Sequence, residues 1–167
     1  MDFTPLDIKL IELVQKSDML GPKFNEIAGI VKKPPSTVFR RIKALEEKGV
    51  IKKYTAIIDP KKVNRGLTAF LYIKLMYPGR IKGPEDVREH AEYLMNLDEV
   101  QELYIPVGSW NFMAKTRTEG IEQQYRFIEE KIMPLPIDDV RSEVIMVPLK
   151  EAGSIKPSIR RVDQATE

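Results

Sequence analysis

The chain has 167 residues, 43% of them hydrophobic and 31% charged, which is typical of a soluble globular protein with one medium domain or two small ones. It contains no cysteine and a single histidine, His90, so disulfides, thiolate-held zinc, thiol catalysis and multi-histidine metal sites are excluded. No apolar run approaches the length needed to cross a bilayer, and the N-terminal segment MDFTPLDIKL lacks the basic and apolar regions of a signal peptide, so we expect a cytoplasmic protein.

The net charge of +2 hides an asymmetry along the chain. Residues 1–66 hold 14 basic and 8 acidic side chains, whereas residues 67–167 hold 13 and 17. A basic first third suggests that this part faces a polyanion. Two solvated surfaces of chance composition would give the same charges, so the residue pattern has to decide.

Three short helices are expected in the first third. The first starts at Pro5 behind a Thr4 cap, and its apolar stripe consists of Leu6, Leu10, Leu13 and Val14. Gly21-Pro22 breaks the chain, and the next helix carries on one face Phe24, Ile27, Ala28 and Val31. The third helix runs from about Pro35 to Lys48 and is stopped by Gly49.

The third helix carries the strongest functional signal. Its expected buried face consists of Val38, Ile42 and Leu45. The opposite face is short, basic and hydroxyl-bearing, with Ser36, Arg40, Lys43 and Ala44, and Thr37 on its flank. Arginine binds guanine bidentately, hydroxyls reach bases or phosphates, and alanine contacts a thymine methyl group. The pattern therefore predicts a helix-turn-helix that binds DNA.

Three further basic residues accompany this helix. Arg41 lies beside the buried face and suits a phosphate or an intramolecular acid better than a base. The segment Val50–Pro60 predicts a strand rich in β-branched residues, which would serve as a wing or as a connector. Lys52 and Lys53 on this segment either reach DNA phosphate or form ordinary solvated surface.

The pattern changes from Leu67 onward. A strand over residues 67–77 is followed by the Pro78–Pro84 loop and a helix with Val87, Ala91 and Leu94 on one face. Strands over Val100–Val107 and Trp110–Thr116 are joined by a tight turn at Gly108-Ser109. The next helix has the apolar stripe Ile121, Tyr125, Ile128 and Ile132, and Val140–Val147 supplies the last strand.

This order, βαββαβ, predicts a ferredoxin-like domain with two helices on one face of an antiparallel sheet. The other face needs a partner, and a homodimer through the sheets is the economical solution. The fold class is α+β: a winged helix-turn-helix domain (1–60), a linker (61–66), the βαββαβ domain (67–150) and a polar tail (151–167). The tail is expected to be mobile, with a weak DNA or partner contact as the alternative.

The residues resemble the Lrp/AsnC (feast/famine) transcriptional regulators over roughly residues 5–150. The resemblance rests on LDIKLIELVQ, NEIAGIV, STVFRRIKALEEKGVIKKYTAIIDPKKV and LTAFLYIKL, in the right order and spacing. The most specific part is STVxxRIxxLEExGVI followed by YxAxxDP. The resemblance implies a DNA-binding N-terminal domain and a C-terminal domain that dimerises, assembles into tetramers or octamers and binds small effectors, usually amino acids.

The resemblance also assigns site residues. DNA binding falls to Ser36, Thr37, Arg40, Arg41 and Lys43, to which we add the basic neighbours Lys33, Lys52 and Lys53. The effector and assembly site falls on the glycine turn of the second domain, at Val107, Gly108, Ser109, Trp110 and Asn111. Glycine there lets backbone amides approach a ligand carboxylate or adopt positive φ. Trp110 either packs at an interface between copies or stacks on a ligand.

Two positions depart from the family pattern. Asn111 is neutral where the family usually has an acid, so either the effector is not a simple amino acid held through its ammonium group, or none binds. Pro34 stands where the family usually has a capping serine, which costs the third helix about 1 kcal/mol. We expect DNA binding to survive with an altered base preference.

We therefore expect a sequence-specific transcriptional regulator that binds a near-palindromic double-stranded operator, with or without an amino-acid effector. No cofactor, metal, membrane partner or catalytic activity is expected. One alternative is an architectural protein that compacts DNA with little sequence preference. Another is an enzyme similar to the siroheme decarboxylases, for which the single His90 equips the chain poorly.

Overall fold

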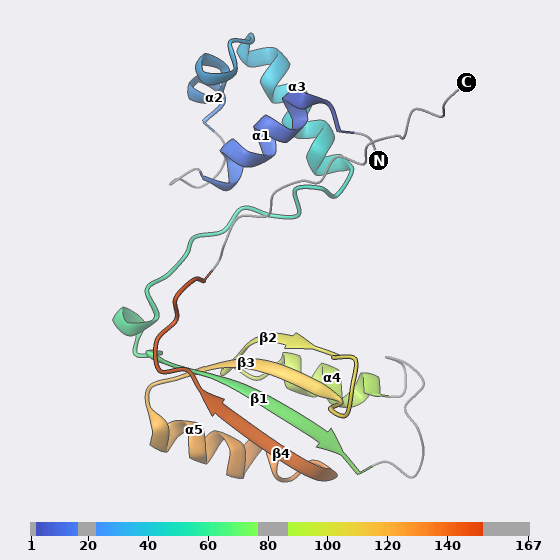
Figure 1. The fold of residues 1–167 in the computed structure, drawn as a ribbon, viewed down its shortest axis with the longest axis vertical. Helices are drawn as coiled ribbons and strands as arrows, with labels where there is room; N and C mark the ends of the chain where they lie inside the picture. The colour runs from blue at the N-terminus through green and yellow to red at the C-terminus, as the bar shows by residue number, and fades with distance from the viewer. Residues whose placement is uncertain (1–2, 17–22, 77–86, 152–167) are drawn as a thin grey trace, which may run out of the picture. The chain divides into compact units, whose positions relative to one another are not determined.

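The structure is a computed structural model that describes residues 3–16, 23–76 and 87–151 (Figure 1). The chain divides into two compact units, one holding the described residues up to Ile57 together with residues 150–151, and one spanning Ile58–Leu149. Each unit is described by itself. No helix in the described ranges combines the length and the apolar character needed to cross a membrane. The predicted break at Gly21-Pro22, the Pro78–Pro84 loop and the tail beyond residue 151 lie outside the described residues.

The first unit consists of three helices, α1 (Pro5–Gln15), α2 (Phe24–Val31) and α3 (Pro35–Glu47), as the sequence predicts. Thr4 caps α1 in a capping box with Asp7: the Asp7 amide donates to Thr4 Oγ1 at 3.2 Å, and the Thr4 amide donates to Asp7 Oδ2 at 3.0 Å. Gly49, at φ +67°, follows the end of α3. The core is apolar and comes from all three helices: Leu10, Ile27, Ala28, Val38, Ile42 and Leu45.

The strand predicted over Val50–Pro60 is wrong. Residues 52–59 are exposed and carry no strand, and Val50 and Ile51 donate their amides back to the Leu45 carbonyl at the end of α3. A β-rich composition does not hold a strand unless a second strand accepts its hydrogen bonds, and none lies beside this segment in the described part of the chain. The segment is a connector, followed by the 3₁₀ helix η1 (Pro60–Val63), which Asp59 caps.

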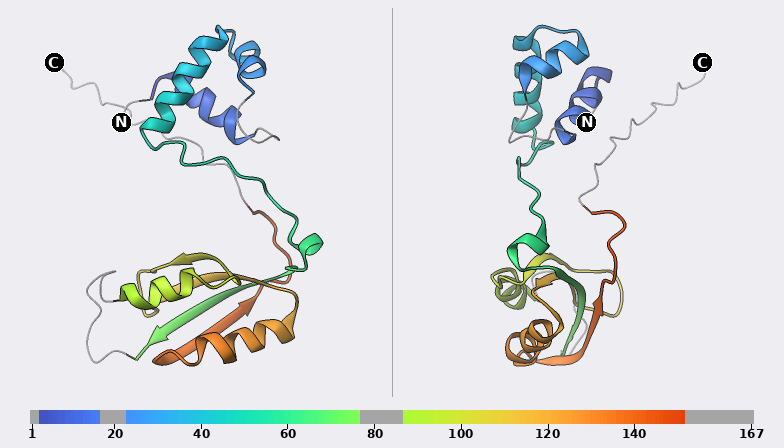
Figure 2. Two further views of the ribbon diagram at one scale, coloured as in Figure 1. Left: turned by 180° about the vertical axis from the view of Figure 1, so that it is seen from behind. Right: turned by 90° about the vertical axis from the view of Figure 1, so that its left-hand side faces the viewer.

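The second unit has the predicted βαββαβ order: β1 (Leu67–Leu75), α4 (Arg88–Met95), β2 (Val100–Tyr104), β3 (Phe112–Thr118), α5 (Ile121–Phe127) and β4 (Ile137–Val144). The strands form one antiparallel sheet in the order β2-β3-β1-β4. Figure 2 shows α4 and α5 on the same face of this sheet. The core lies between that face and the helices, around Leu71, Ile73, Leu94, Phe112 and Ile132.

Several strand boundaries differ from the prediction, including the end of β1 at Leu75 and the end of β3 at Thr118. The second strand ends at Tyr104 rather than Val107, since Pro106 has no amide to donate to the ladder. The third begins at Phe112 rather than Trp110, so residues 105–111 form a longer loop and the predicted tight turn at Gly108-Ser109 is wrong. The last spans Ile137–Val144 rather than Val140–Val147, because its length is set by pairing with β1.

The apolar stripe predicted for α5 is also wrong in its first half. Ile121 and Tyr125 are 62% and 65% exposed, whereas Gln124 and Phe127 are each 2% exposed. The α-helix continues into a π-helical turn, η3 (Ile128–Ile132), and its wider turn brings Ile132 into the core. Periodicity of 3.6 residues therefore does not describe the buried face of this helix.

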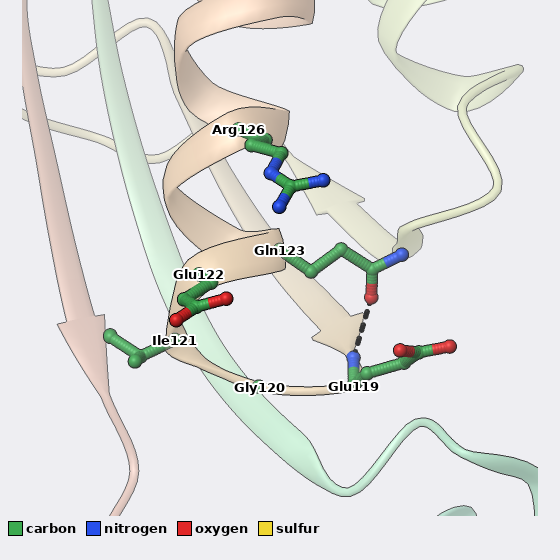
Figure 3. A pocket seen from close by; sticks show the side chains of 6 residues that line it. All are labelled: Glu119, Gly120, Ile121, Glu122, Gln123 and Arg126. Atoms are coloured by element: carbon green, nitrogen blue, oxygen red, sulfur yellow. Dashed lines mark hydrogen bonds between the residues drawn. The ribbon is translucent and has the colours of Figure 1, made fainter.

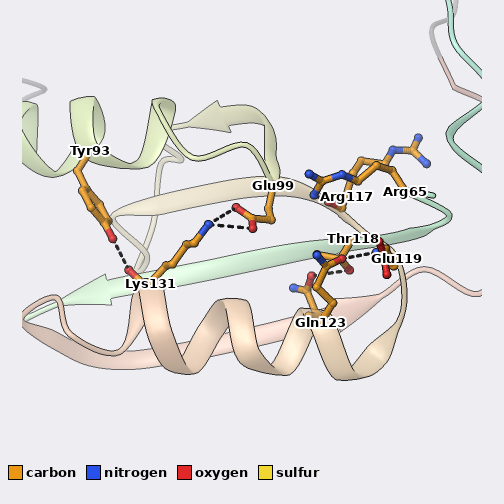
Figure 4. Close-up of polar contacts among 9 residues, drawn as sticks. Arg65, Tyr93, Glu99, Arg117, Thr118, Glu119, Gln123 and Lys131 are labelled. Atoms are coloured by element: carbon orange, nitrogen blue, oxygen red, sulfur yellow. Dashed lines mark hydrogen bonds and ion pairs between the residues drawn. The ribbon is translucent and has the colours of Figure 1, made fainter. Parts of the chain in front are cut away.

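Polar contacts tie the π-helical turn to the rest of the second unit (Figure 4). Lys131 Nζ donates to both carboxylate oxygens of Glu99, at 2.9 and 3.0 Å, next to the start of β2. The Tyr93 hydroxyl of α4 donates to the Lys131 carbonyl at 3.0 Å. The carbonyl of Lys131 thus finds a partner outside its own helix, which a π-turn in a helix often requires.

Candidate nucleic-acid interface

The two faces of α3 separate as the sequence predicts. Val38 and Ile42 are fully buried and Leu45 is 3% exposed, so one face of the helix is fixed against α1 and α2. Ser36, Arg40 and Lys43 are exposed on the other side, and Thr37 is half-buried on the flank. A helix packed on one side with an exposed basic face on the other has the form needed to enter a major groove.

The turn before α3 adds positive charge at the end of the helix that would enter the groove. Lys32 adopts a left-handed conformation with φ 52° and donates its amide to the Ala28 and Gly29 carbonyls, which ends α2. Lys33 follows and is exposed. Pro34 is the N-cap of α3 and supplies no side-chain cap, as expected, but its carbonyl accepts from the amides of Thr37 and Val38.

Arg40 and Arg41 differ in their surroundings. Arg41 Nη1 lies 3.7 Å from Oδ1 of Asp7, the acid of the α1 capping box, and this ion pair links α3 to α1. Arg40 is exposed and forms no ion pair or hydrogen bond with the described residues. Of the two guanidinium groups, only that of Arg40 has no acidic partner among the described residues.

Lys43 already has an acidic partner. Its Nζ donates to Glu46 Oε2 at 2.7 Å, and the Tyr54 hydroxyl donates to Glu46 Oε1 at 2.8 Å. The hydrogen bonds from Lys43 and Tyr54 lower the pKa of the Glu46 carboxyl, and burial together with the bond to Glu46 raises the pKa of the Tyr54 hydroxyl. Lys43 must exchange this carboxylate for a phosphate to bind DNA, so its net contribution to binding is reduced.

Lys52 and Lys53 are exposed on the connector that follows α3. The connector is anchored at Tyr54 through Glu46, which keeps the two lysines near the C-terminal turn of α3. Neither lysine forms an ion pair with another described residue. Their placement fits phosphate contacts outside the groove rather than base contacts.

The glycine turn of the second unit has an exposed part and a part that packs against β1. Val107, Gly108 and Ser109 are exposed, and Gly108 has φ +146°, in a region that side-chain-bearing residues rarely adopt. Trp110 packs against Tyr72 with 5.8 Å between ring centroids. Asn111 Oδ1 accepts from the Leu75 amide at 2.6 Å, and the Asn111 amide donates to the Ile73 carbonyl at 2.9 Å.

A shallow depression of about 460 Å³ lies at the other end of the sheet, over the first turn of α5 (Figure 3). The Gln123 side chain lines this depression, and its Oε1 accepts a hydrogen bond from the Glu119 amide at 2.6 Å. β3 leads from the glycine turn at Phe112 to this end at Thr118, so the depression and the turn are separate sites. No group of acids and histidines that could hold a metal ion occurs among the described residues.

The helical pattern assigned no role to Phe39, an exposed residue of α3. Phe39 is 47% exposed and packs edge-on against Phe24 of α2, with ring centroids 5.2 Å apart. It follows the buried Val38 directly and precedes Arg40, so it lies between the core and the basic face. An apolar residue that lies outside the buried face of Val38, Ile42 and Leu45 is the sequence feature that distinguishes Phe39.

Comparison with known proteins agrees with this arrangement. The family description "Lrp/AsnC ligand binding domain" matches residues 68–155, and "winged helix-turn-helix DNA-binding" matches residues 21–52. The chain is 32% identical over 145 residues to the HTH-type transcriptional regulator FL11 of Pyrococcus furiosus, covering 87% of this chain and 88% of FL11. It is 26% identical over 156 residues to the leucine-responsive regulatory protein of Escherichia coli, covering 92% of this chain and 91% of that protein.

Solved structures show the same two-domain fold. An AsnC family transcriptional regulator from Agrobacterium tumefaciens superposes with a TM-score of 0.78 and 27% identity, over 89% of this chain and 94% of that one. A transcriptional regulator from Neisseria meningitidis in complex with L-methionine gives a TM-score of 0.81 at 22% identity, over 92% and 96%. The match to the Lrp/AsnC ligand binding domain alone covers more than half of the chain. The match to the DNA-binding domain lies in a separate part of the sequence. The chain therefore belongs to the Lrp/AsnC family of DNA-binding transcriptional regulators.

Proposed function

We propose that two copies of this chain bind a near-palindromic operator, with the α3 helices in successive major grooves about ten base pairs apart. The observation that carries the proposal is the exposed guanidinium of Arg40, which has no partner among the described residues, on a helix whose opposite face is buried. In this arrangement Arg40 reads a base, and Ser36 and Thr37 contact bases or phosphates. Lys33, Arg41, Lys43, Lys52 and Lys53 contribute mainly to phosphate binding.

The homodimer forms through the sheet face that α4 and α5 leave uncovered. Since Leu71 and Ile73 point toward the helices, Phe70 and Tyr72 point to the opposite face, where Met113 of β3 pairs with Tyr72. These side chains are only half-buried within one chain. A second copy would cover them, and assembly of dimers into tetramers or octamers would follow from contacts at the glycine turn.

The effector site lies at the exposed part of the glycine turn, Val107–Ser109, and takes a small molecule of the amino-acid class. The neutral Asn111 side chain uses its oxygen to hold the Leu75 amide, so it offers no charge to an ammonium group. The ligand would therefore be held through its carboxylate, by backbone amides around Gly108. The L-methionine bound to the Neisseria meningitidis regulator gives the class to screen first.

We expect Gly108→Asp to change the size of the assembled species or its response to amino acids, while the dimer persists. The substitution adds a carboxylate that repels a ligand carboxylate and places a side chain at φ +146°. Sedimentation velocity with and without each standard amino acid measures both effects. Gly108→Ala is the matched control, since it places a side chain at the same φ of +146° without adding a charge. Unchanged assembly and response in Gly108→Asp would remove this turn from the effector site.

Selection from a random duplex library at physiological salt tests the proposed function as a whole. A sequence-specific regulator enriches a two-fold-symmetric motif and binds it about a thousandfold or more tightly than a scrambled duplex. Tight binding without enrichment would instead indicate an architectural protein that compacts DNA. The proposed function includes no catalytic step, requires no cofactor and operates in the cytoplasm, where the chromosome is accessible.

A further inference from the structure

Phe39 is an exposed aromatic side chain on the helix that carries the basic face. Although it follows the buried Val38, it does not belong to the hydrophobic core of its unit, and 47% of its surface is accessible. Among the described residues its ring contacts that of Phe24, edge-on at 67° between ring planes. The core therefore does not explain why an aromatic residue stands at this position.

The surroundings of Phe39 are polar and basic. On a helix the residues three before and four after it share its side, and these are Ser36 and Lys43, both exposed. Arg40 follows it in the chain and is also exposed. A partner that covers the ring must also satisfy this positive charge, which favours a polyanion over an apolar protein surface.

We propose that Phe39 reads sequence by packing against the C5-methyl group of a thymine in the major groove. This inference rests on the proposed function, because it requires α3 to enter the groove. The thymine methyl is the apolar group that the major groove offers, and phenylalanine is among the side chains that contact it. The Phe39 ring already packs against Phe24 without DNA, so part of the entropy cost of ordering it is met before DNA binds.

A double-substitution cycle on protein and DNA tests the inference. The duplex is the operator obtained by selection, and each thymine of one half-site is replaced in turn by deoxyuridine, which lacks only the methyl group. Affinities are measured for the full-length chain, for Phe39→Ala and for Ile30→Ala. Ile30 is the matched control, because it is an exposed apolar residue (57%) on α2 that likewise lies outside the core.

Replacing one particular thymine by deoxyuridine should lower the affinity of the unsubstituted protein for the duplex about fourfold, as expected for one methyl group taken out of water. Phe39→Ala should bind the two duplexes equally, whereas Ile30→Ala should keep the fourfold difference. If Phe39→Ala lowers the melting temperature too far, Phe39→Gln keeps the side-chain length and gives the same comparison. Selection with Phe39→Ala should then return a motif with that one position relaxed.

Other outcomes overturn the inference in distinguishable ways. If a motif is enriched but no thymine shows coupling to Phe39, the inference is wrong and the proposed function stands. If Phe39→Ala changes the sedimentation coefficient instead of the base preference, the ring is a contact between copies of the chain. If selection enriches no motif at all, the proposed function fails and the inference fails with it.

Discussion

Arg40→Ala is expected to weaken binding to the selected operator by about 1–3 kcal/mol and to relax the preference at one base pair. Arg40 is the exposed guanidinium of α3 without a competing acid among the described residues, so its removal deletes a contact and leaves no internal partner behind. A bidentate contact with guanine is worth this much in discrimination against other bases. Titration of the operator and its single-base variants measures both effects.

Lys52→Ala is the control for Arg40→Ala. Lys52 is exposed on the connector beyond the end of α3, and we expect it to contact a phosphate rather than a base edge. The variant should weaken binding to operator and scrambled duplexes alike and lower the slope of log affinity against log salt by about one. If Arg40→Ala behaves like Lys52→Ala, or leaves affinity and preference intact, the orientation of α3 assumed here is wrong.

The structure also ranks the other basic residues of α3 below Arg40. Arg41 lies 3.7 Å from Asp7, and Lys43 donates to Glu46 at 2.7 Å, so each must give up an internal acid to contact DNA. The sequence alone allowed Arg41 an intramolecular acid but gave Lys43 a free outward position. Glu46 lies three residues after Lys43, a spacing at which side chains meet on a helix, so this partner follows from helical periodicity. The hydrogen bond from Tyr54 to Glu46 does not, because Tyr54 lies beyond the helix.

Local rules were sufficient for the three described helices of the first unit. Thr4, Pro5 and Gly49 act through contacts with their near neighbours in the chain, and the buried face of α3 follows from the 3.6-residue period. The connector was predicted wrongly because strand formation depends on a second strand that sequence does not supply. The same composition forms β1 where β3 and β4 lie on either side of it.

The second unit shows where periodicity fails. The predicted stripe treated α5 and η3 as one regular helix and chose the apolar residues Ile121 and Tyr125 as its buried side. The sheet beneath the start of α5 instead presents the buried hydroxyls of Thr116 and Thr118, so the helix covers it with an amide rather than an aliphatic side chain. Which residues of α5 are buried therefore depends on the side chains of β3, which the periodicity of the helix itself does not include.

Asn111 illustrates what the sequence could and could not say about the effector site. The missing acidic charge was visible in the sequence, and it still limits the chemistry of any ligand there. The hydrogen bond from the Leu75 amide to Asn111 Oδ1 was not visible, because it joins residues at the end of β1 and the start of β3. An aspartate oxygen could accept the same bond, so the fold does not require the neutral side chain.

Gln124→Ala is expected to destabilise the second unit by about 2–4 kcal/mol, the largest stability effect predicted here for a polar residue. Gln124 Oε1 accepts from the hydroxyls of Thr116 at 3.2 Å and Thr118 at 3.3 Å, and Nε2 donates to Ser142 Oγ at 3.4 Å. The side chain thus joins α5 to β3 and β4 inside the core. Alanine would remove these bonds and leave a cavity lined by hydroxyl groups.

Gln123→Ala provides the matched control at the neighbouring position. Gln123 makes one hydrogen bond, from the Glu119 amide at 2.6 Å, and is half-buried at the surface (Figure 3), so its loss should cost about 0.5–1.5 kcal/mol. Urea unfolding at one protein concentration, followed by the fluorescence of Trp110, measures both variants, since the only tryptophan of the chain lies in the second unit. Equal losses for the two glutamines would mean that the buried amide of Gln124 does not hold α5 to the sheet more strongly than an ordinary surface hydrogen bond does.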